Sequence, residues 1–256
     1  MIAAITCVDK NWGIGYQGKL LTKIPEDMKF FHEKTKGNAV VMGRKTYDSL
    51  PNNKRPLPNR FNHIISRGVS GGLNWRKNKD GSNSYTLEAM KVLLKTIQIN
   101  KNVFEKLSNV FIIGGGQIYK ELLPFCEKAF VTEIDNAFEN VDTYFPNLKE
   151  LPDWYLVKIG KEKEYNGLKY RFNEYERFNY KIINVIPDWS DFTEWIEIQL
   201  ANKTIIGFPI KYYFHGSKTI EYIGNTNMPL HFEIQENFDK FLVKLTLYKQ
   251  NKNREV

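Results

Sequence analysis

Short, continuous apolar runs recur along the first two thirds of the chain and predict strands that are buried on both faces of a sheet. These runs cover residues 2–8, 38–42, 61–65, 110–113 and 128–134. Segments with helical spacing of apolar residues lie between the runs, at residues 25–34, 87–97 and 117–123. Buried strands that alternate with helices predict an α/β fold for this part of the chain.

The last third has a different pattern. Residues 155–163 and 170–178 alternate between apolar and polar positions and predict a terminal hairpin. Beyond them we expect an amphipathic helix at 188–200 after Pro187, and a closing helix or strand at 237–250. Short antiparallel strands are predicted at 204–208, 210–214, 219–223 and 230–234. The chain therefore divides into an α/β domain, residues 1–178, and a small α+β extension, residues 179–256.

Polar, glycine-rich segments separate these elements. Residues 68–84 predict a surface loop with a short strand near 73–76, and residues 142–146 predict a turn. Residues 13–18 match the pattern G-x-G-x-x-G, but Lys19 to Lys23 intervene before the helix signal at Pro25. The dinucleotide-binding motif requires its glycines to open a helix directly, so we expect a mobile loop close to a ligand and not a Rossmann fold.

Composition restricts the class of protein. The chain has 256 residues, of which 42% are hydrophobic and 14% aromatic, which excludes global disorder. No apolar run approaches the length of a membrane span, and no signal peptide is expected because residues 1–5 enter a strand pattern directly. The two cysteines, Cys7 and Cys126, lack metal-ligand spacing, so we expect reduced thiols, no metal site and a cytoplasmic protein.

The net charge of +8 lies entirely in the first domain. Residues 179–256 contain nine basic and nine acidic residues, so residues 1–178 contain 28 of the 37 basic and 20 of the 29 acidic residues. A basic first domain fits an anionic ligand. No zinc-finger spacing, RNA-binding aromatic motif or Lys/Arg-rich helix indicates nucleic acid, and we expect no nucleic-acid or membrane partner.

Cations and hydroxyl groups follow two of the predicted strands, and a run of glycines follows a third. Gly43 to Thr46 follow the second strand, Ser66 and Arg67 follow the third, and three glycines, 114–116, separate the fourth from a helix. Glycine lets the backbone approach a ligand closely, and the N–H groups that open a helix bind phosphate. Because the carboxyl ends of parallel strands share one edge of a sheet, these segments predict a site for a phosphorylated nucleotide.

Asp27 is the candidate acid–base residue. Pro25 suits the first position of a helix, and Asp27 lies in the first turn beside the apolar face formed by Ile24, Met28 and Phe31. Most acids in such positions interact only with the helix dipole. A carboxyl beside an apolar wall is partly desolvated, which raises its pKa towards values useful for proton transfer.

Taken together and in this order, the motifs of residues 2–178 resemble those of the dihydrofolate reductase family. They are Gly13-Ile14-Gly15, Ile24-Pro25-Glu26-Asp27, Val41-Met42-Gly43-Arg44-Lys45-Thr46, Arg55-Pro56-Leu57-Pro58-Asn59-Arg60, Ile113-Gly114-Gly115-Gly116, Thr132 and Asp142-Thr143-Tyr144-Phe145-Pro146. The resemblance implies a mixed, mostly parallel central sheet with flanking helices. Residues 179–256 resemble nothing in that family.

The resemblance implies a dihydrofolate site around Asp27. Asp27 would hold the amino group and N3 of the pterin and promote protonation of N5, and Thr132 would support its carboxylate. The carbonyl groups of Ile5 and Ile113 would accept the exocyclic amine of the pterin. Arg60 would bind the α-carboxylate of the glutamate tail. The side chains implied to enclose the rings are Met28, Phe31, Leu50 and Leu57.

It also implies NADPH as the cofactor. Two arginines near the adenosine 2′-position favour NADPH over NADH. Gly114 and Gly115 occupy the place where the family has a cis peptide. The cofactor-binding residues implied are Cys7, Ile14, Gly15, Gly43, Arg44, Lys45, Thr46, Ser66, Arg67, Gly114, Gly115, Gly116, Gln117, Ile118 and Tyr119.

One position departs from the family pattern. Leu21 and Thr22 stand where the family has Pro-Trp just before the catalytic helix. Thr22 is smaller than Trp but can hold a water molecule through its hydroxyl group, so we expect it to take part in catalysis. Hydride transfer depends mainly on placing two rings face to face and is expected to persist. Proton delivery, loop closure and antifolate affinity are the steps that this change puts in question.

The sequence predicts NADPH-dependent reduction of 7,8-dihydrofolate to 5,6,7,8-tetrahydrofolate. The alternative is a folate- and NADPH-binding or structural protein that has the same fold and little turnover. A pyrimidine reductase of riboflavin synthesis shares the fold, but the helix acid and Arg60 disfavour it. Two roles stay open for the extension: a small α+β domain of its own, or a face that pairs subunits in a homo-oligomer.

Overall fold

The computed structural model describes residues 1–69, 72–99, 109–151 and 153–177 with their side chains. For residues 180–188, 193–200, 205–215 and 217–222 it describes the backbone. The chain forms two compact units, one of Met1–Glu150 with Lys158–Glu176 and one of Leu151–Val157 with Arg177–Val256. β11 (Trp154–Lys158) is shared between them.

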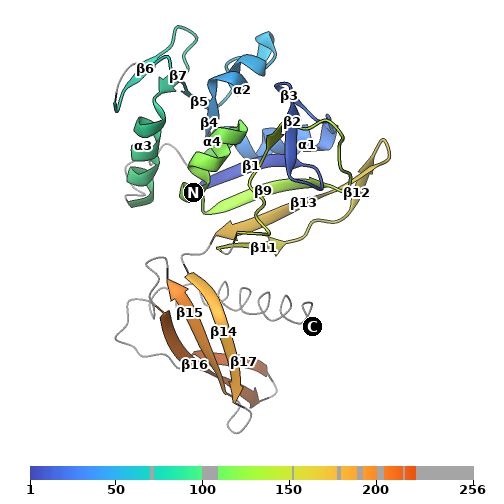
Figure 1. Cartoon of the computed structure of the whole chain (residues 1–256), viewed down its shortest axis with the longest axis vertical. Coiled ribbons are helices and arrows are strands. Elements are labelled where there is room, and N and C mark those ends of the chain that lie inside the picture. The colour runs from blue at the N-terminus through green and yellow to red at the C-terminus, as the bar shows by residue number, and fades with distance from the viewer. Residues whose placement is uncertain are drawn as a thin grey trace. The chain divides into compact units, whose positions relative to one another are not determined.

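The first unit is built on a mixed, mostly parallel sheet with the strand order β13-β9-β1-β8-β4-β5-β7-β6, with β12 paired to β13 (Figure 1). The pairs that join β1, β4, β5, β7, β8 and β9 are parallel, whereas β13 pairs antiparallel with β9 and β6 with β7. The bounds are β1 (Ile2–Val8), β4 (Ala39–Gly43), β5 (Phe61–Ile65), β6 (Trp75–Lys77), β7 (Asn83–Tyr85), β8 (Val110–Gly114), β9 (Lys128–Ile134), β12 (Lys163–Tyr165) and β13 (Leu168–Arg177). This arrangement confirms the predicted α/β fold.

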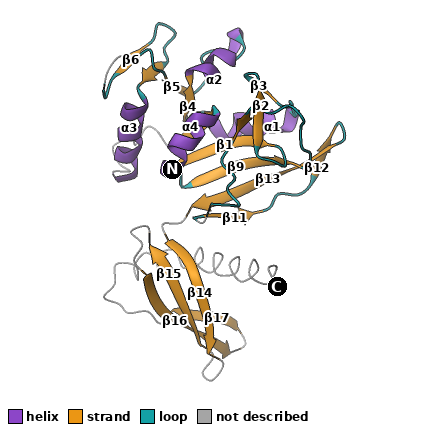
Figure 2. Ribbon diagram, in the orientation of Figure 1, coloured by secondary structure: helices purple, strands orange, loops and turns teal. Residues whose placement is uncertain are grey.

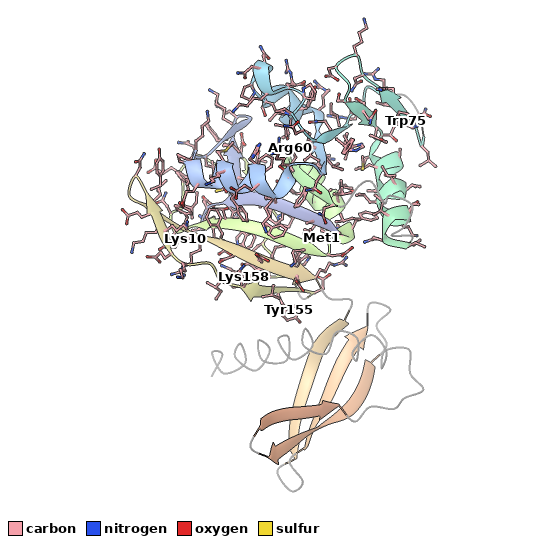
Figure 3. The ribbon with its side chains drawn as sticks, turned by 180° about the vertical axis from the view of Figure 1, so that it is seen from behind. Met1, Lys10, Arg60, Trp75, Tyr155 and Lys158 are labelled. Carbon is pink, nitrogen blue, oxygen red and sulfur yellow. The ribbon has the colours of Figure 1, made fainter. Side chains whose placement is uncertain are left out.

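Helices cover both faces of this sheet. They are α1 (Pro25–Thr35), α2 (Arg44–Ser49), α3 (Leu87–Ile99) and α4 (Gly116–Leu122), with short 3-10 turns η1 (Asn52–Lys54) and η3 (Leu123–Phe125). Figures 1 and 3, seen from opposite sides, show α1 on one face and α4 on the other. Phe30 and Phe31 of α1 pack on a core that includes Ile5, Met42 and Phe111. The helices predicted at 25–34, 87–97 and 117–123 are confirmed.

The glycine-rich segment 13–18 forms a hairpin where a loop was expected. β2 (Gly13–Tyr16) pairs with β3 (Lys19–Leu20) and with β10 (Thr143–Tyr144), which lies in the predicted turn 142–146. A Cβ on Gly15 would lie 2.8 Å from the carbonyl oxygen of Lys19, and one on Gly13 would lie 2.7 Å from Val141. Close approach within the hairpin therefore accounts for both glycines without a ligand.

Residues 68–84 hold more regular structure than predicted. β6 corresponds to the strand expected near 73–76, but β7 lies within the stretch that was expected to be loop. β7 pairs in parallel with β5, and Ser84 is buried at 4% exposure. The polar residues of β7 gave no apolar alternation from which a strand could be predicted.

The terminal hairpin is formed by β12 and β13, and only its second strand lies where it was predicted. The first predicted strand, 155–163, covers most of β11 and meets β12 only at Lys163. The turn of the hairpin is Asn166–Gly167, and both residues have positive φ, 50° and 76°. Two-residue turns with positive φ at both positions match the twist of antiparallel strands, and Asn-Gly is their preferred sequence. The turn pairs Tyr165 with Leu168 and Lys163 with Tyr170.

The second unit contains an antiparallel sheet in the order β14-β15-β16-β17 (Figure 2). Its strands are β14 (Tyr180–Asp188), β15 (Thr193–Leu200), β16 (Ile205–His215) and β17 (Ser217–Tyr222). The helix predicted at 188–200 is wrong, because its described part is the end of β14 and all of β15. Residues 196–200 alternate with period two, as a strand does, whereas Trp189, Phe192 and Trp195 recur every three residues, a spacing that also fits a helix. The predictions for 230–234 and 237–250 lie outside the described residues.

The strands predicted at 204–208 and 210–214 form one strand, β16, and the strand predicted at 219–223 corresponds to β17. Among the described residues, no helix is long and apolar enough to cross a membrane.

Candidate active site

Asp27 and Thr132 lie together where α1 meets β9. The Thr132 hydroxyl donates a 2.6 Å hydrogen bond to Oδ1 of Asp27, and Thr132 is 1% exposed. Burial raises the pKa of Asp27, and the hydrogen bond from Thr132 opposes that shift in part. The pair can therefore present a carboxyl group with increased proton affinity to a ligand beside α1.

Cys7 lies next to this pair on β1. It is in register with Thr132 on β9. Burial raises the pKa of the Cys7 thiol, and the negative charge of Asp27 raises it further. The thiol is therefore neutral at physiological pH and contributes an apolar surface.

Two backbone carbonyl groups that we expected to bind the ligand lie on the neighbouring strands β1 and β8. Ala4 pairs with Ile112, so the next residues, Ile5 in the middle of β1 and Ile113 near the end of β8, follow side by side. The carbonyl oxygen of Ile5 accepts a 2.7 Å hydrogen bond from the hydroxyl of Tyr119. Because a carbonyl oxygen has two lone pairs, that of Ile5 can accept a second donor.

The apolar side chains expected to enclose a ligand come from α1 and from residues 50–57. Leu57 belongs to the core at 8% exposure, and Phe31 and Leu50 pack against that core. Met28 is 45% exposed. This apolar wall is therefore buried at Leu57 and exposed to solvent at Met28.

Arg60 is held against the C-terminal half of α1, as its label beside that helix shows in Figure 3. Its Nε donates to the Thr35 hydroxyl at 2.8 Å, and its Nη1 donates to the Pro58 carbonyl at 2.8 Å. The guanidinium carbon lies 5.7 Å from the centre of the Phe31 ring. Partial burial lowers the pKa of Arg60, but an arginine stays charged at physiological pH. These contacts fix the direction in which the cation points.

The glycine turns after β4 and β8 lie against each other. Thr46 Oγ1 accepts a 2.9 Å hydrogen bond from the N–H of Gly115, and a Cβ on Gly43 would lie 3.0 Å from Ile118. Gly114 has φ of +134°, where other residues are strained. The expected cis peptide at 114–115 is wrong, since the cis peptide bond of the described residues is Arg55–Pro56.

Cations surround the two turns. Arg44 pairs with Asp48 at 2.7 Å in an exposed i,i+4 pair, which contributes little energy and can rearrange. Among the described residues, Lys45 and Arg67 are exposed and form no ion pair. Ser66 is buried, and its hydroxyl accepts the N–H of Gly68 at 3.1 Å. Gln117 is exposed at the start of α4, and Tyr119 is buried.

Thr22 and the hairpin complete the expected site. Thr22 is half-buried between β3 and α1, and no hydrogen bond from it to Asp27 occurs among the described residues. Ile14 and Gly15 lie in β2, whose turn is held by a 2.7 Å hydrogen bond from the N–H of Gln17 to Asp142. The structure thus joins Asp27 to Thr132 by a hydrogen bond and shows none between Asp27 and Thr22 among the described residues.

The sequence did not indicate that Glu26, next to Asp27, has partners of its own on the sheet. Glu26 accepts a 2.6 Å hydrogen bond from the Tyr170 hydroxyl and contacts Lys163 at 3.0 Å. Its partners are 137 and 144 residues away in the sequence. Only the Asn-Gly turn, which fixes the register of β12 and β13, could have indicated that Lys163 and Tyr170 lie together.

Comparison with known proteins agrees with this geometry. The family model for dihydrofolate reductase matches residues 1–177. A dihydrofolate reductase from Aedes albopictus is 34% identical over 187 residues, which are 68% of this chain and 95% of that protein. One from Bacillus subtilis is 30% identical over 181 residues, 70% of this chain and 96% of that protein.

A bifunctional dihydrofolate reductase-thymidylate synthase from Glycine max is 37% identical over 186 residues. The match covers 68% of this chain but only 33% of that protein, so the chain spans about a third of such bifunctional relatives. The matched region contains Asp27, Thr132, Arg60 and the facing glycine turns. The chain belongs to the dihydrofolate reductase family.

Proposed function

We propose that this chain catalyses the NADPH-dependent reduction of 7,8-dihydrofolate to 5,6,7,8-tetrahydrofolate. The observation that carries the proposal is the buried pair of Asp27 and Thr132 at the start of α1, in a chain of this family. A carboxyl beside an apolar wall is suited to bind a cationic or amide-like pterin edge and to favour its protonation.

Asp27 acts on the pterin side of the reaction. Its carboxylate accepts hydrogen bonds from the amino group and N3 of the pterin, while the Thr132 hydroxyl fixes the position of Oδ1. The raised pKa of Asp27 increases the proton affinity of this region, so a proton reaches N5 through water near Asp27 and Thr22. The carbonyl groups of Ile5 and Ile113 accept the exocyclic amine of the pterin.

The remaining substrate contacts come from α1 and residues 50–60. Met28, Phe31, Leu50 and Leu57 enclose the rings, and their apolar surfaces exclude water from the reacting face. Arg60 binds the α-carboxylate of the glutamate tail through its planar guanidinium. Its hydrogen bonds to Thr35 and Pro58 preorganise it for that contact.

The residues around the two glycine turns fit a phosphorylated dinucleotide. Exposed Lys45 and Arg67 supply positive charge, and a Cβ at Gly43 or Gly115 would fill the space between the turns. The residues that would hold NADPH are Cys7, Ile14, Gly15, Gly43, Arg44, Lys45, Thr46, Ser66, Arg67, Gly114, Gly115, Gly116, Gln117, Ile118 and Tyr119. When bound, NADPH supplies the hydride that C6 of the pterin accepts.

We also propose that residues 1–178 form the catalytic domain and residues 179–256 an extension that pairs subunits of a cytoplasmic homo-oligomer. The basic first domain and the neutral second part support this division of roles.

Steady-state turnover of the full chain with NADPH and dihydrofolate tests the proposal. Asp27→Asn should lower kcat by about 100-fold or more, since removing a general acid–base group typically costs that much. Its Kd for NADPH should stay within about two-fold of wild type, because a local change on the pterin side leaves the cofactor contacts in place. Asp135→Asn, which removes an exposed carboxylate paired with Lys10, is the matched control and should leave kcat unchanged.

A second outcome would favour a binding protein of the same fold. Tight binding of folate and NADPH without turnover would identify Leu21 and Thr22 as the defect, since they replace the Pro-Trp pair expected before α1. Equal loss of NADPH binding and turnover in Asp27→Asn would contradict the assignment of Asp27 to the substrate side.

A further inference from the structure

Two consecutive carboxylates in the first turn of α1 are held by different strands of the sheet. Asp27 accepts the hydroxyl of Thr132 on β9 at 2.6 Å. Glu26 accepts the hydroxyl of Tyr170 on β13 at 2.6 Å. Each carboxylate therefore has one short hydrogen bond to a side chain from the sheet, and together these bonds fix the rotation of the helix start.

Lys163 on β12 adds a third anchor. Its Nζ lies 3.0 Å from both oxygens of Glu26, so the contact is bifurcated over the carboxylate. Exposed ion pairs alone contribute little energy. Here, however, the partner carboxylate is already oriented by Tyr170, so less side-chain entropy is lost when Lys163 binds it.

The register of the strands places these anchors in one row. The Asn166–Gly167 turn pairs Lys163 with Tyr170 across the hairpin. β13 in turn pairs Tyr170 with Ile134 and Phe172 with Thr132. Because side chains two residues apart on a strand share a face, Tyr170 and Phe172 both point towards α1.

Tight packing makes this row rigid. Tyr170 is 2% exposed and belongs to a cluster with Ile24, the residue that precedes α1. The Phe172 ring meets the Tyr170 ring edge to face at 5.6 Å and lies 4.6 Å from the ring of Phe30 on α1. The start of α1 is thus held by packing as well as by hydrogen bonds.

Glu26, which is next to Asp27 in the sequence, forms the ion pair of this row with Lys163. Glu26 has a lowered pKa, first because of the Tyr170 hydroxyl and then because of Lys163 and Lys29. The other titratable groups that interact with Asp27 are Cys7 on β1, Tyr119 on α4 and Tyr170 on β13. Their pKa values are raised, that of Tyr170 to about 12, so all three are neutral at physiological pH.

We propose that Tyr170 and Lys163 are positioning residues for Asp27, which hold Glu26 and thereby keep Asp27 aligned with Thr132 and the pterin. This inference rests on the proposed reductase function. Neither residue touches the substrate in this account. Their effect is on the orientation and proton affinity of Asp27, so removing them should alter catalysis more than it alters folding.

The chain offers a matched control for the key substitution. Tyr175 lies on the same strand, is 1% exposed and also donates its hydroxyl to a carboxylate, that of Glu133 on β9. Glu133 is paired with Lys149 at 2.6 Å, as Glu26 is paired with Lys163. Tyr170→Phe and Tyr175→Phe thus lie on the same strand, and each removes a hydrogen bond from a tyrosine hydroxyl to a carboxylate. Of the two tyrosines, only Tyr170 faces α1.

Kinetics and a direct titration of Asp27 test the inference in the full chain. Tyr170→Phe and Lys163→Met should each lower kcat about five-fold, the effect of losing one hydrogen bond, while the KM for NADPH stays unchanged. Lys163→Arg should keep kcat at the wild-type value, because arginine retains the positive charge that binds Glu26. Tyr175→Phe should lower the melting temperature without changing kcat.

The titration uses carbon-13 NMR of aspartate carboxyl groups, with Asp27→Asn identifying the Asp27 resonance. Tyr170→Phe should move the Asp27 titration to higher pH, because the hydrogen bond from Thr132 that lowers the pKa is weakened. Tyr175→Phe should leave that titration unchanged.

The outcomes separate this inference from the proposed function. If the wild-type chain shows no turnover, the reductase proposal fails, and the titration still decides whether Tyr170 controls Asp27. If Tyr170→Phe lowers the melting temperature as Tyr175→Phe does but leaves both kcat and the Asp27 titration at wild-type values, Tyr170 is only structural and the inference is wrong.

Discussion

Burial of Asp27 makes the protein less stable when that carboxyl is ionised. Its pKa in the folded state is raised above the ordinary value, chiefly by desolvation. In the window between the ordinary pKa and the raised one, the folded state binds more protons than the unfolded state. Stability is therefore lost as the pH rises through that window and stays low above it.

Asp27→Asn should consequently stabilise the fold near neutral pH while it removes activity. The neutral amide carries no desolvated charge and can still hydrogen-bond to Thr132. Denaturant unfolding of wild type and variant at neutral and acidic pH measures this, and the gain should shrink as the pH falls. Asp135→Asn is the control, since the pKa of Asp135 is lowered by Lys10 and its loss should bring no gain. A variant less stable than wild type at neutral pH would contradict the account.

His63 is a second buried titratable group, and it lies on β5. It is 9% exposed, and its Nδ1 has no hydrogen-bond partner among the described residues. Burial lowers the pKa of His63 to about 4. Since the unfolded chain takes up this proton near the ordinary pKa of about 6.5, stability present above that value is lost as the pH falls towards 4.

His63→Leu should therefore make the protein more stable, most clearly in acid. Removing an unpaired buried polar atom gains about 1 kcal/mol at neutral pH, and the gain should grow as the pH falls below about 6. Urea unfolding at neutral and mildly acidic pH measures both effects. His32→Leu, at an exposed position of α1, is the comparison for replacing a histidine by leucine. A constant difference between His63→Leu and wild type across pH would show that His63 does not titrate in this range.

At the scale of residues, the start of a helix marked Asp27 as a candidate, and the family resemblance added Thr132. Lys163 and Tyr170 could not be found in this way. Their relation to Glu26 depends on strand register across 137 and 144 residues, and local sequence carries no direct signal for such a contact.

At the scale of elements, the predictions succeeded where apolar spacing was strong. The helices α1, α3 and α4 and the buried strands β1, β4, β5, β8 and β9 were predicted within a few residues. β7 was missed because its buried face is polar, with Ser84 hydrogen-bonded to Asn78. The helix predicted at 188–200 was wrong because bulky aromatics can fit either period over so short a stretch.

The β12–β13 turn gives a test at this scale. Gly167 has φ of +76°, so Gly167→Ala forces a side chain into a strained conformation and should destabilise the protein by about 1 kcal/mol. The melting temperature measures this loss. Gly68→Ala is the matched control, because Gly68 lacks a positive φ and its added Cβ would meet only Ser66 Oγ at 3.5 Å. Equal effects of the two variants would contradict the importance of the turn.

At the scale of the whole molecule, the family match and the strand pattern coincide. The match ends at residue 177, where β13 also ends. The described strands beyond it, β14 to β17, pair only with one another among the described residues. The fold of the first unit could be predicted because continuous apolar runs alternate with helical segments along the sequence. The extension contains no motif that indicates its architecture or role.

A chain ending at Phe178 should remain folded, bind NADPH and reduce dihydrofolate, but it should form smaller particles than the full chain. Multi-angle light scattering of both forms measures the difference in mass. Circular dichroism of the shortened chain is the control for folding. A shortened chain that does not fold would show that the extension is required for the core, and equal masses would contradict its role in pairing subunits.

The most direct test of the account is whether the purified full chain consumes NADPH when dihydrofolate is added. The loss of NADPH absorbance should depend on dihydrofolate, yield tetrahydrofolate in equal amount and disappear in Asp27→Asn. NADPH binding without consumption, or consumption that Asp27→Asn leaves intact, would contradict the central claim that Asp27 at the start of α1 makes this fold a reductase.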